Sequence, residues 1–191
     1  HLPGTQVGDV PENAIKTSLY CAECHGLFEP KTEPYATWTG SLMGQAGRDQ
    51  LFFAQMTTAN QDVDKVGYFC MRCHVPLSFV TGHAYDTDGS TLDDFDREGV
   101  ACHFCHSMVD PIYDSRFSPD EDKRVLGGLA EVPEYYGNAM FVLDPTGLRR
   151  GPRDDTEAFH SVAPSKFFRS GDFCGTCHDV GNVTLNRMPD G

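Results

Sequence analysis

The sequence predicts a single domain of short α-helices and irregular loops with little β-structure. Glycine and proline supply 19 and 12 of the 191 residues, and both residues interrupt regular elements. Only 39% of the residues are apolar, which is modest for a chain that must bury a core made of its own side chains. We therefore expect the helices of residues 1–191 to be wrapped around bound groups that supply part of the core.

The cysteines indicate what these groups are. All eight occur in four Cys-x-x-Cys pairs, and each pair is followed directly by histidine. This is the attachment signature of c-type haem. One helical turn between the two thiols matches the two vinyl groups of a porphyrin edge, and the next residue projects toward the iron. The sequence predicts four haem c groups, bound by Cys21, Cys24, Cys70, Cys73, Cys102, Cys105, Cys174 and Cys177, with His25, His74, His106 and His178 as proximal iron ligands.

Other uses of paired cysteines account for less of this pattern. Disulfide bonds give no reason for a histidine behind every pair. Zinc ribbons contain Cys-x-x-Cys, and two such pairs can share one ion, but they do not need a histidine fixed after each pair. Chance does not explain four such histidines, since only 8 of the 191 residues are histidine. The haem interpretation is the one that uses every position of the motif.

The first part of the chain is expected to contain an arm and a longer helix. Residues 1–20 are interpreted as an irregular arm that ends in a short helix over 14–20, leading into the first motif. The strongest helical pattern lies within residues 35–60. Apolar side chains recur there at helical spacing from Leu51 onward, and Asp49 precedes them as a cap.

The later segments are expected to be richer in turns. Residues 82–100 are acidic, and the run Asp86-Thr87-Asp88-Gly89 resembles half of a calcium loop without its closing glutamate, so a solvated acidic turn is the favoured interpretation. The longest stretch without a motif, residues 107–173, contains many prolines and glycines and a short predicted strand at 141–143.

Three arginines form a local basic patch in this acidic chain: Arg149, Arg150 and Arg153. Arginine is a good partner for a haem propionate because its planar fork binds carboxylates. The same side chains can equally pair with the neighbouring Asp154 and Asp155, and the sequence leaves both possibilities open.

The second axial ligand of each iron must come from elsewhere in the chain. Four histidines remain after the proximal ligands, which equals the number of predicted irons. Candidate distal ligands are His83 in a glycine-flanked turn, His103 inside the third motif, and His160 after an acidic loop. His1 is a weaker candidate, because it requires an ordered terminus. Met43 is a rival fourth ligand, since thioether ligation suits a c-type cytochrome iron.

Three segments resemble those of multihaem cytochromes in the cytochrome c554-like group. Residues 35–46 (Tyr-Ala-Thr-Trp-Thr-Gly-Ser-Leu-Met-Gly-Gln-Ala) resemble the Trp-x-x-Ser-x-His-Ala segment that follows the first haem motif in that group. Residues 98–106 resemble its Gly-Val-x-Cys-x-x-Cys-His segment, and residues 170–179 its Leu-Cys-Gly-x-Cys-His segment. The resemblance implies a tetrahaem cytochrome. Met43 stands where the first segment commonly has an axial histidine, so that iron is expected to be His/Met-ligated or open.

Electron transfer through closely spaced haems is the function expected from these observations. Four haems in so short a chain must be near neighbours, and each potential is then set by ligand, burial and charge. Two alternatives remain open. One is a redox enzyme with one open iron that acts on a small nitrogen or sulfur species. The other is a subunit of a polymeric extracellular cytochrome filament or of a larger redox complex. Enough candidate ligands exist to close all four irons, so a carrier is favoured over an enzyme.

The net charge of −13 limits the partners. It argues against nucleic acid and anionic lipid, both of which need a basic surface. It favours a redox partner protein with a basic face, or further copies of the chain in an assembly. No apolar run is long enough for a membrane span. Because haem is attached to such motifs outside the cytoplasm, the expected location is periplasmic or extracellular, after removal of a signal peptide. The end of the sequence resembles the middle of a turn, so the natural chain is expected to continue beyond residue 191.

Overall fold

A computed structural model describes residues 2–182 of the chain. Its α-helices are α1 (Ser18–His25), α2 (Pro34–Thr39), α3 (Leu42–Gln45), α4 (Gln50–Asp62), α5 (Gly67–His74), α6 (Pro76–Thr81), α7 (Cys102–Ser107), α8 (Asp120–Gly127) and α9 (Gly171–His178). The 3-10 helices are η1 (Glu12–Ala14), η2 (Ala46–Arg48), η3 (His83–Asp86), η4 (Asp96–Glu98) and η5 (Lys166–Arg169). The strands are β1 (Met108–Val109), β2 (Val142–Leu143), β3 (Arg149–Gly151) and β4 (Val162–Pro164). The predicted class of short helices and loops with little strand is confirmed.

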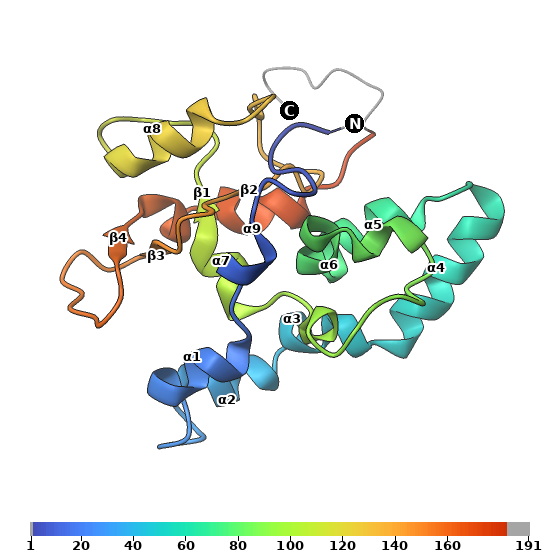
Figure 1. Cartoon of the computed structure of the whole chain (residues 1–191), viewed down its shortest axis with the longest axis horizontal. Helices are drawn as coiled ribbons and strands as arrows, with labels where there is room; N and C mark the ends of the chain where they lie inside the picture. Colours follow the sequence, from blue (N-terminus) through green and yellow to red (C-terminus); the bar gives the residue numbers. More distant parts are fainter. Residues whose placement is uncertain (1, 183–191) are drawn as a thin grey trace.

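The elements spread outward from a central group of helices (Figure 1). Helices α7 and α9 lie near the middle of the view, α4 and α5 lie on one side, and α1 with α2 projects from the lower end. Helix α5 packs on α6 and α4, whereas α1 packs on α2 and α7. Two small sheets join distant segments: β1 pairs antiparallel with β2, and β3 pairs in parallel with β4. The loop of residues 152–161 connects the second pair.

A side-chain core is present around α6. Val75, Leu77, Phe79 and Val80 at this helix are almost completely buried. Phe141 of the segment leading into β2 packs edge-on against Phe104 of α7, with ring centroids 4.9 Å apart. The partly buried cysteines of the second motif and Cys105 and Cys177 border this cluster. The core therefore lies between motif helices, and side chains of the second, third and fourth motifs pack directly on it.

The prediction of a short helix over residues 14–20 is wrong in its bounds. The helix instead begins at Ser18 and contains the first motif, and the segment before it forms only the short helix η1. The physical reason is the cap, because the Thr17 side chain accepts a hydrogen bond from the backbone N–H of Tyr20.

The longer helix and the short strand are confirmed. Helix α4 begins at Gln50 inside the predicted range of residues 35–60 and extends two residues beyond it to Asp62, and the Asp49 side chain caps it by accepting from the backbone N–H of Leu51. Its apolar pattern is only partly buried, since Met56 is covered while the Leu51 side chain is 78% exposed. Residues 142 and 143 of the predicted strand form β2. No helix in the described part of the chain combines the length and apolarity needed to cross a membrane.

Candidate functional site

All four Cys-x-x-Cys-His motifs lie on short helices. Helices α1, α5 and α9 each end at the histidine of their motif, and α7 ends one residue after His106. On a helix, residues three and four apart share one face. The two thiols and the histidine of each motif are therefore arranged as covalent attachment along one porphyrin edge requires.

The cysteines are free thiols, and they bring the motifs together in pairs. All eight lie within residues 2–182 without a disulfide bond. The thiol of Cys21 in the first motif hydrogen-bonds Cys102 in the third, which lowers the pKa of Cys102 to about 7. In the same way Cys73 of the second motif meets Cys177 of the fourth, with 4.0 Å between the Cys73 Sγ and the Cys177 carbonyl.

Electrostatic coupling relates these two pairs. Burial, together with the neighbouring charges of Cys102 and Cys174, raises the pKa of Cys105 to about 12. Cys105 also lies close enough to Cys177 to raise the pKa of that thiol. The third motif is thus next to the fourth, and the motifs follow one another in space in the order first, third, fourth, second.

The structure gives no support for zinc bound to these cysteines. Among residues 2–182, three or more potential ligand atoms come within 4.8 Å of one another only at His83, Asp93 and Asp96. No cysteine belongs to that group, so the paired thiols do not form the closed four-ligand site that structural zinc requires.

The proximal candidate His106 is held in the orientation of a metal ligand. Its Nδ1 lies 2.7 Å from the backbone carbonyl of Arg150. A carbonyl only accepts, so the ring proton is on Nδ1, and Nε2 keeps its lone pair. The ring also stacks on Phe168 of η5, with centroids 5.6 Å apart. Burial lowers the pKa of His106, which favours the neutral form, the form in which histidine can bind a metal.

A fully buried ion cluster fixes the carbonyl that orients His106. The Arg150 side chain hydrogen-bonds Asp122 through Nε at 2.8 Å and pairs with Asp144 at 2.8 Å. All three side chains have no exposed surface. Burial raises the pKa of Asp122 to about 6, although Arg150 opposes this shift. One arginine thus compensates two buried carboxylates behind the third motif.

The three arginines of the predicted basic patch have different surroundings in the structure. Arg150 is buried as described, while Arg149 donates to the Ser107 hydroxyl and to His103. Arg153 is exposed and pairs with Asp155, with 3.0 Å between Nε and Oδ1. The pairing with a neighbouring aspartate therefore holds for Arg153 alone among the three arginines.

His25 and His160 face each other across a gap. Their ring centroids are 6.3 Å apart and their planes are tilted by 51°. With a metal–nitrogen bond of about 2 Å on each side, two imidazoles on opposite faces of one metal have centroids about 6 Å apart. The Nδ1 of His160 lies 3.2 Å from the Ser161 carbonyl, which only accepts, so the neutral ring carries its proton on Nδ1 and keeps the lone pair on Nε2. The exposed loop 152–161 thus carries a candidate ligand to the first motif.

The other candidate distal ligands have different surroundings. His83 is hydrogen-bonded to the buried Asp96, and this bond raises the pKa of His83. His103 is buried, and its Nδ1 accepts from the backbone N–H of Lys16 at 3.0 Å and from Arg149 at 3.1 Å. The His103 proton then lies on Nε2, so this ring acts as a hydrogen-bond acceptor that joins distant segments. His1 lies outside the described residues.

Met43 lies where two of the segments quoted for the resemblance meet. Its side chain is half-exposed, and its carbonyl accepts from the backbone N–H of Val100 at 3.0 Å. The Trp38 indole donates to the Val100 carbonyl at 2.9 Å. Gly99 adopts a φ of +70°, and a Cβ there would lie 2.7 Å from the Met43 carbonyl. Segment 35–46 therefore packs on segment 98–106, which requires glycine at residue 99.

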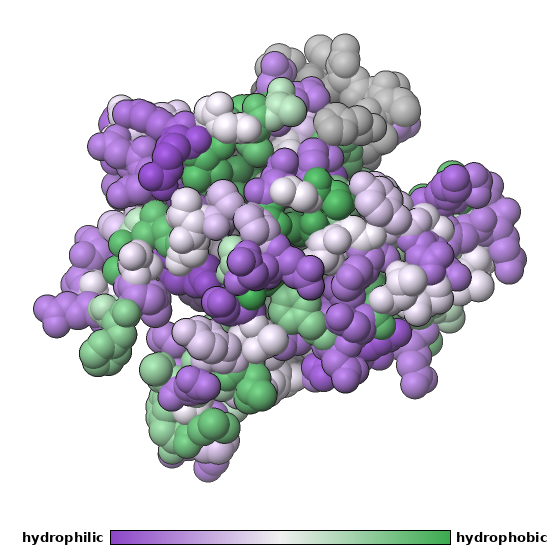
Figure 2. Space-filling model, viewed as in Figure 1, coloured by the Kyte–Doolittle hydropathy of each residue, from purple (hydrophilic) through white to green (hydrophobic). Residues whose placement is uncertain are grey.

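Exposed apolar side chains gather beside the motifs and candidate ligands. Figure 2 shows such residues over the lower end of the molecule, where α1 and α2 lie. The large exposed side chains within three residues of a motif or a candidate ligand are Leu19, Tyr20, Leu27, Phe28, Leu42, Tyr85, Phe159 and Val180. Exposed apolar patches usually mark a surface that something else covers. An apolar macrocycle at each motif would cover these side chains, so the residues present fit haem.

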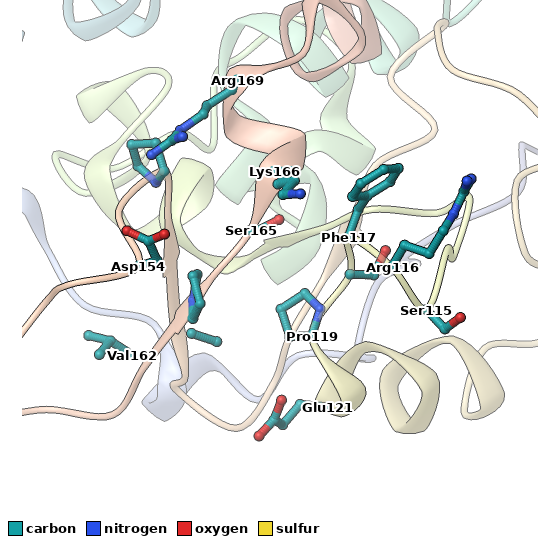
Figure 3. A pocket seen from close by; sticks show the side chains of 14 residues that line it. Ser115, Arg116, Phe117, Pro119, Glu121, Asp154, Val162, Ser165, Lys166 and Arg169 are labelled. Carbon is teal, nitrogen blue, oxygen red and sulfur yellow. The ribbon is translucent and has the colours of Figure 1, made fainter.

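An open hollow of about 430 Å³ lies beside the η5 segment (Figure 3). Its cations are Arg116, Lys166 and Arg169, and its carboxylates are Glu121 and Asp154. The Lys166 ammonium lies over the Phe117 ring, 4.2 Å from its centroid. The mixed charges select no particular ligand. Sequence reasoning missed this hollow, because its lining comes from three separate segments.

The acidic turn is closed by its own hydrogen bonds. The Ser90 hydroxyl donates to the Asp86 carboxylate, and the Ser90 backbone N–H donates to Asp88. These contacts fit the interpretation of a solvated turn. Comparison of the chain with protein-family models, with curated proteins and with solved structures gave no match.

Proposed function

We propose that this protein is a tetrahaem c-type cytochrome that transfers electrons outside the cytoplasm. The observation that carries the proposal is that cysteines of different motifs lie close together. Cys21 meets Cys102, Cys73 meets Cys177, and Cys105 lies near enough to Cys177 to affect its pKa. These proximities give the motif order first, third, fourth, second. Each haem, when bound, supplies a one-electron iron couple.

The side chains of this chain support ligation of the irons. His25, His74, His106 and His178 are the proposed proximal ligands. His160 is proposed as the second ligand opposite His25, because of the 6.3 Å separation of their rings. Met43 and His103 are retained as weaker distal candidates, because the Met43 side chain is half-exposed and the Nδ1 of His103 already accepts two hydrogen bonds.

A haem count and a spin-state measurement test the cofactor. The pyridine haemochrome assay on the purified protein is expected to give four haems per chain. Low-temperature EPR of the oxidised protein is expected to show low-spin iron. A count of zero contradicts the proposal, and a high-spin signal in the intact protein favours small-molecule chemistry at an open iron over a pure carrier.

Two double variants test the proposed path. C102A/C105A removes the second position of the path, and C21A/C24A removes only its first position. NMR of partly reduced samples measures electron exchange between haems within one molecule. In C21A/C24A the three remaining haems should exchange electrons rapidly with one another. In C102A/C105A one of the three remaining haems should no longer exchange electrons rapidly with the other two. Equal behaviour of the two three-haem proteins would contradict the order first, third, fourth, second.

The charge predicts the kind of partner. With 28 acidic and 15 basic residues, the surface favours a redox protein that presents lysine and arginine. Association with such a partner should weaken as salt is added, since exposed charges are screened over about 10 Å at 0.1 M salt.

A further inference from the structure

His83 and Asp96 form a hydrogen bond between a partly exposed ring and a fully buried carboxylate. The His83 Nδ1 lies 2.6 Å from the Asp96 Oδ2. The Asp96 side chain has no exposed surface, whereas 35% of the His83 side chain is exposed. Oδ2 also accepts from the backbone N–H of Asp93 at 3.1 Å, but the buried Oδ1 of Asp96 has no hydrogen-bond partner. A buried carboxylate is costly unless it is hydrogen-bonded, and its side-chain partner here is the Nδ1 of His83.

The contact fixes both the proton and the orientation of the His83 ring. A carboxylate accepts, so Nδ1 carries the proton, and Nε2 on the opposite side of the ring is the available nitrogen. The backbone is held as well, because the Thr91 hydroxyl donates to the His83 carbonyl at 2.8 Å. His83 lines an open hollow of about 370 Å³ together with Gly82, Tyr85, Asp86 and Thr91. The partly exposed His83 ring thus borders open space.

This arrangement is typical of a metal-bound histidine and its supporting carboxylate. A carboxylate on the far nitrogen sets the tautomer, holds the ring, and increases the electron density at the ligating nitrogen. A free divalent cation chelated by His83, Asp93 and Asp96 is a different use of the same side chains. The 2.6 Å contact between His83 and Asp96 favours a metal-bound histidine with a supporting carboxylate. It places a proton on Nδ1, which is the nitrogen that the chelate would need.

We propose that His83 binds one of the four irons through Nε2, and that Asp96 is a positioning residue that lowers the reduction potential of that haem. This inference rests on the proposed function. The negative carboxylate gives the imidazole partial anionic character, which stabilises ferric iron over ferrous iron. Asp93 and Glu12 add negative charge near the same ring. One haem of the four would therefore be set to a lower potential than its ligand alone would give.

The substitution Asp96→Asn tests the role of the carboxylate, with Asp93→Asn as the matched control. D96N removes the charge and keeps the shape, so the haem count should stay at four with all irons low-spin. One midpoint potential should rise by at least the equivalent of a tenfold change in its reduction equilibrium, which is about 59 mV for a one-electron couple. D93N leaves the Asp96–His83 contact in place and should move that potential less.

His83→Ala tests the ligand itself. In H83A one iron should become high-spin while four haems remain attached. Adding D96N to H83A should then cause no further rise in that potential, because the carboxylate acts through the imidazole. A full D96N shift in the H83A protein, or four low-spin irons in H83A, would overturn the inference.

The outcomes separate this inference from the proposed function. If the wild-type protein carries no haem, the proposed function fails. If it carries four haems and H83A leaves all of them low-spin, only the role of His83 and Asp96 fails. Calorimetry with zinc and calcium ions tests the chelate, and one bound ion that is lost in D96N while all irons of H83A stay low-spin would assign the cluster to a cation instead.

Discussion

The first and second motifs have the same five-residue pattern in opposite surroundings. Helix α5 of the second motif lies against the core around α6, and its Met71 and Arg72 side chains are buried. Helix α1 of the first motif lies in the projecting end of the molecule, and its Leu19 and Tyr20 side chains are more than half exposed. One motif is thus supported by the protein's own side chains, whereas the other leaves apolar side chains exposed.

The largest expected effect concerns the buried support of the third motif. Arg150→Met removes the cation that compensates Asp122 and Asp144, and breaking such a buried cluster costs about 3–5 kcal/mol of the free energy of unfolding. Arg153→Met is the control, because the exposed pair with Asp155 contributes little. Urea denaturation of the holoprotein measures both changes. A loss in R150M no greater than that in R153M would contradict the role of the cluster.

A matched pair of phenylalanines tests the comparison directly. Phe79→Ala in the core should destabilise the protein by about 3–5 kcal/mol through the cavity that it leaves. Phe28 is 66% exposed near the first motif, and an exposed side chain normally contributes less than about 0.5 kcal/mol. If a macrocycle covers Phe28, we expect Phe28→Ala to cost about 1–2 kcal/mol in the holoprotein. A cost below that range, measured by urea denaturation, would show that this end has no such cover.

The pH dependence of stability should report on Asp122. Its pKa is about 6 in the folded protein because of burial, above the usual value of about 4. The folded protein holds the Asp122 proton more tightly than the unfolded chain does, so this carboxyl stabilises the fold at a pH below its pKa in the unfolded chain. The contribution is lost as the pH rises through 6. Between pH 4 and 7 the wild type should lose about 1–2 kcal/mol relative to Asp122→Asn. If the free energy of unfolding changes with pH in the same way in the wild type and in D122N, Asp122 does not contribute to the pH dependence.

The smallest expected effect concerns the tie between the two regions. Trp38→Phe removes the indole donor to the Val100 carbonyl and keeps most of the apolar contact, so the free energy of unfolding should fall by about 1 kcal/mol. Hydrogen exchange should increase mainly in α1 and α2, which this bond connects to the centre. Tyr35→Phe is a nearby control that leaves the indole hydrogen bond intact. Equally faster hydrogen exchange in both variants would show that this bond does not hold α1 and α2 to the centre.

The parts of the molecule that local sequence determines were predictable. The motif spacing indicated helical turns with histidine at the end, and Asp49 identified the start of α4. The parallel pairing of β3 with β4 was not predictable, because it joins strands across an irregular loop. The contacts of Arg150 with Asp122, of His83 with Asp96, and of His25 with His160 also depend on the tertiary fold. The sequence showed which side chains can bind metal but not which of them meet.

The spatial order of the motifs has a consequence for how the protein is made. A chain is synthesised from its amino terminus, so the first and second motifs emerge before the third and fourth. In the proposed path, the two early motifs hold the ends and the two late motifs hold the middle. A partly synthesised chain therefore contains both ends of the proposed path before the residues that join them. If the motifs hold haems as proposed, the path would be complete only when α9 folds.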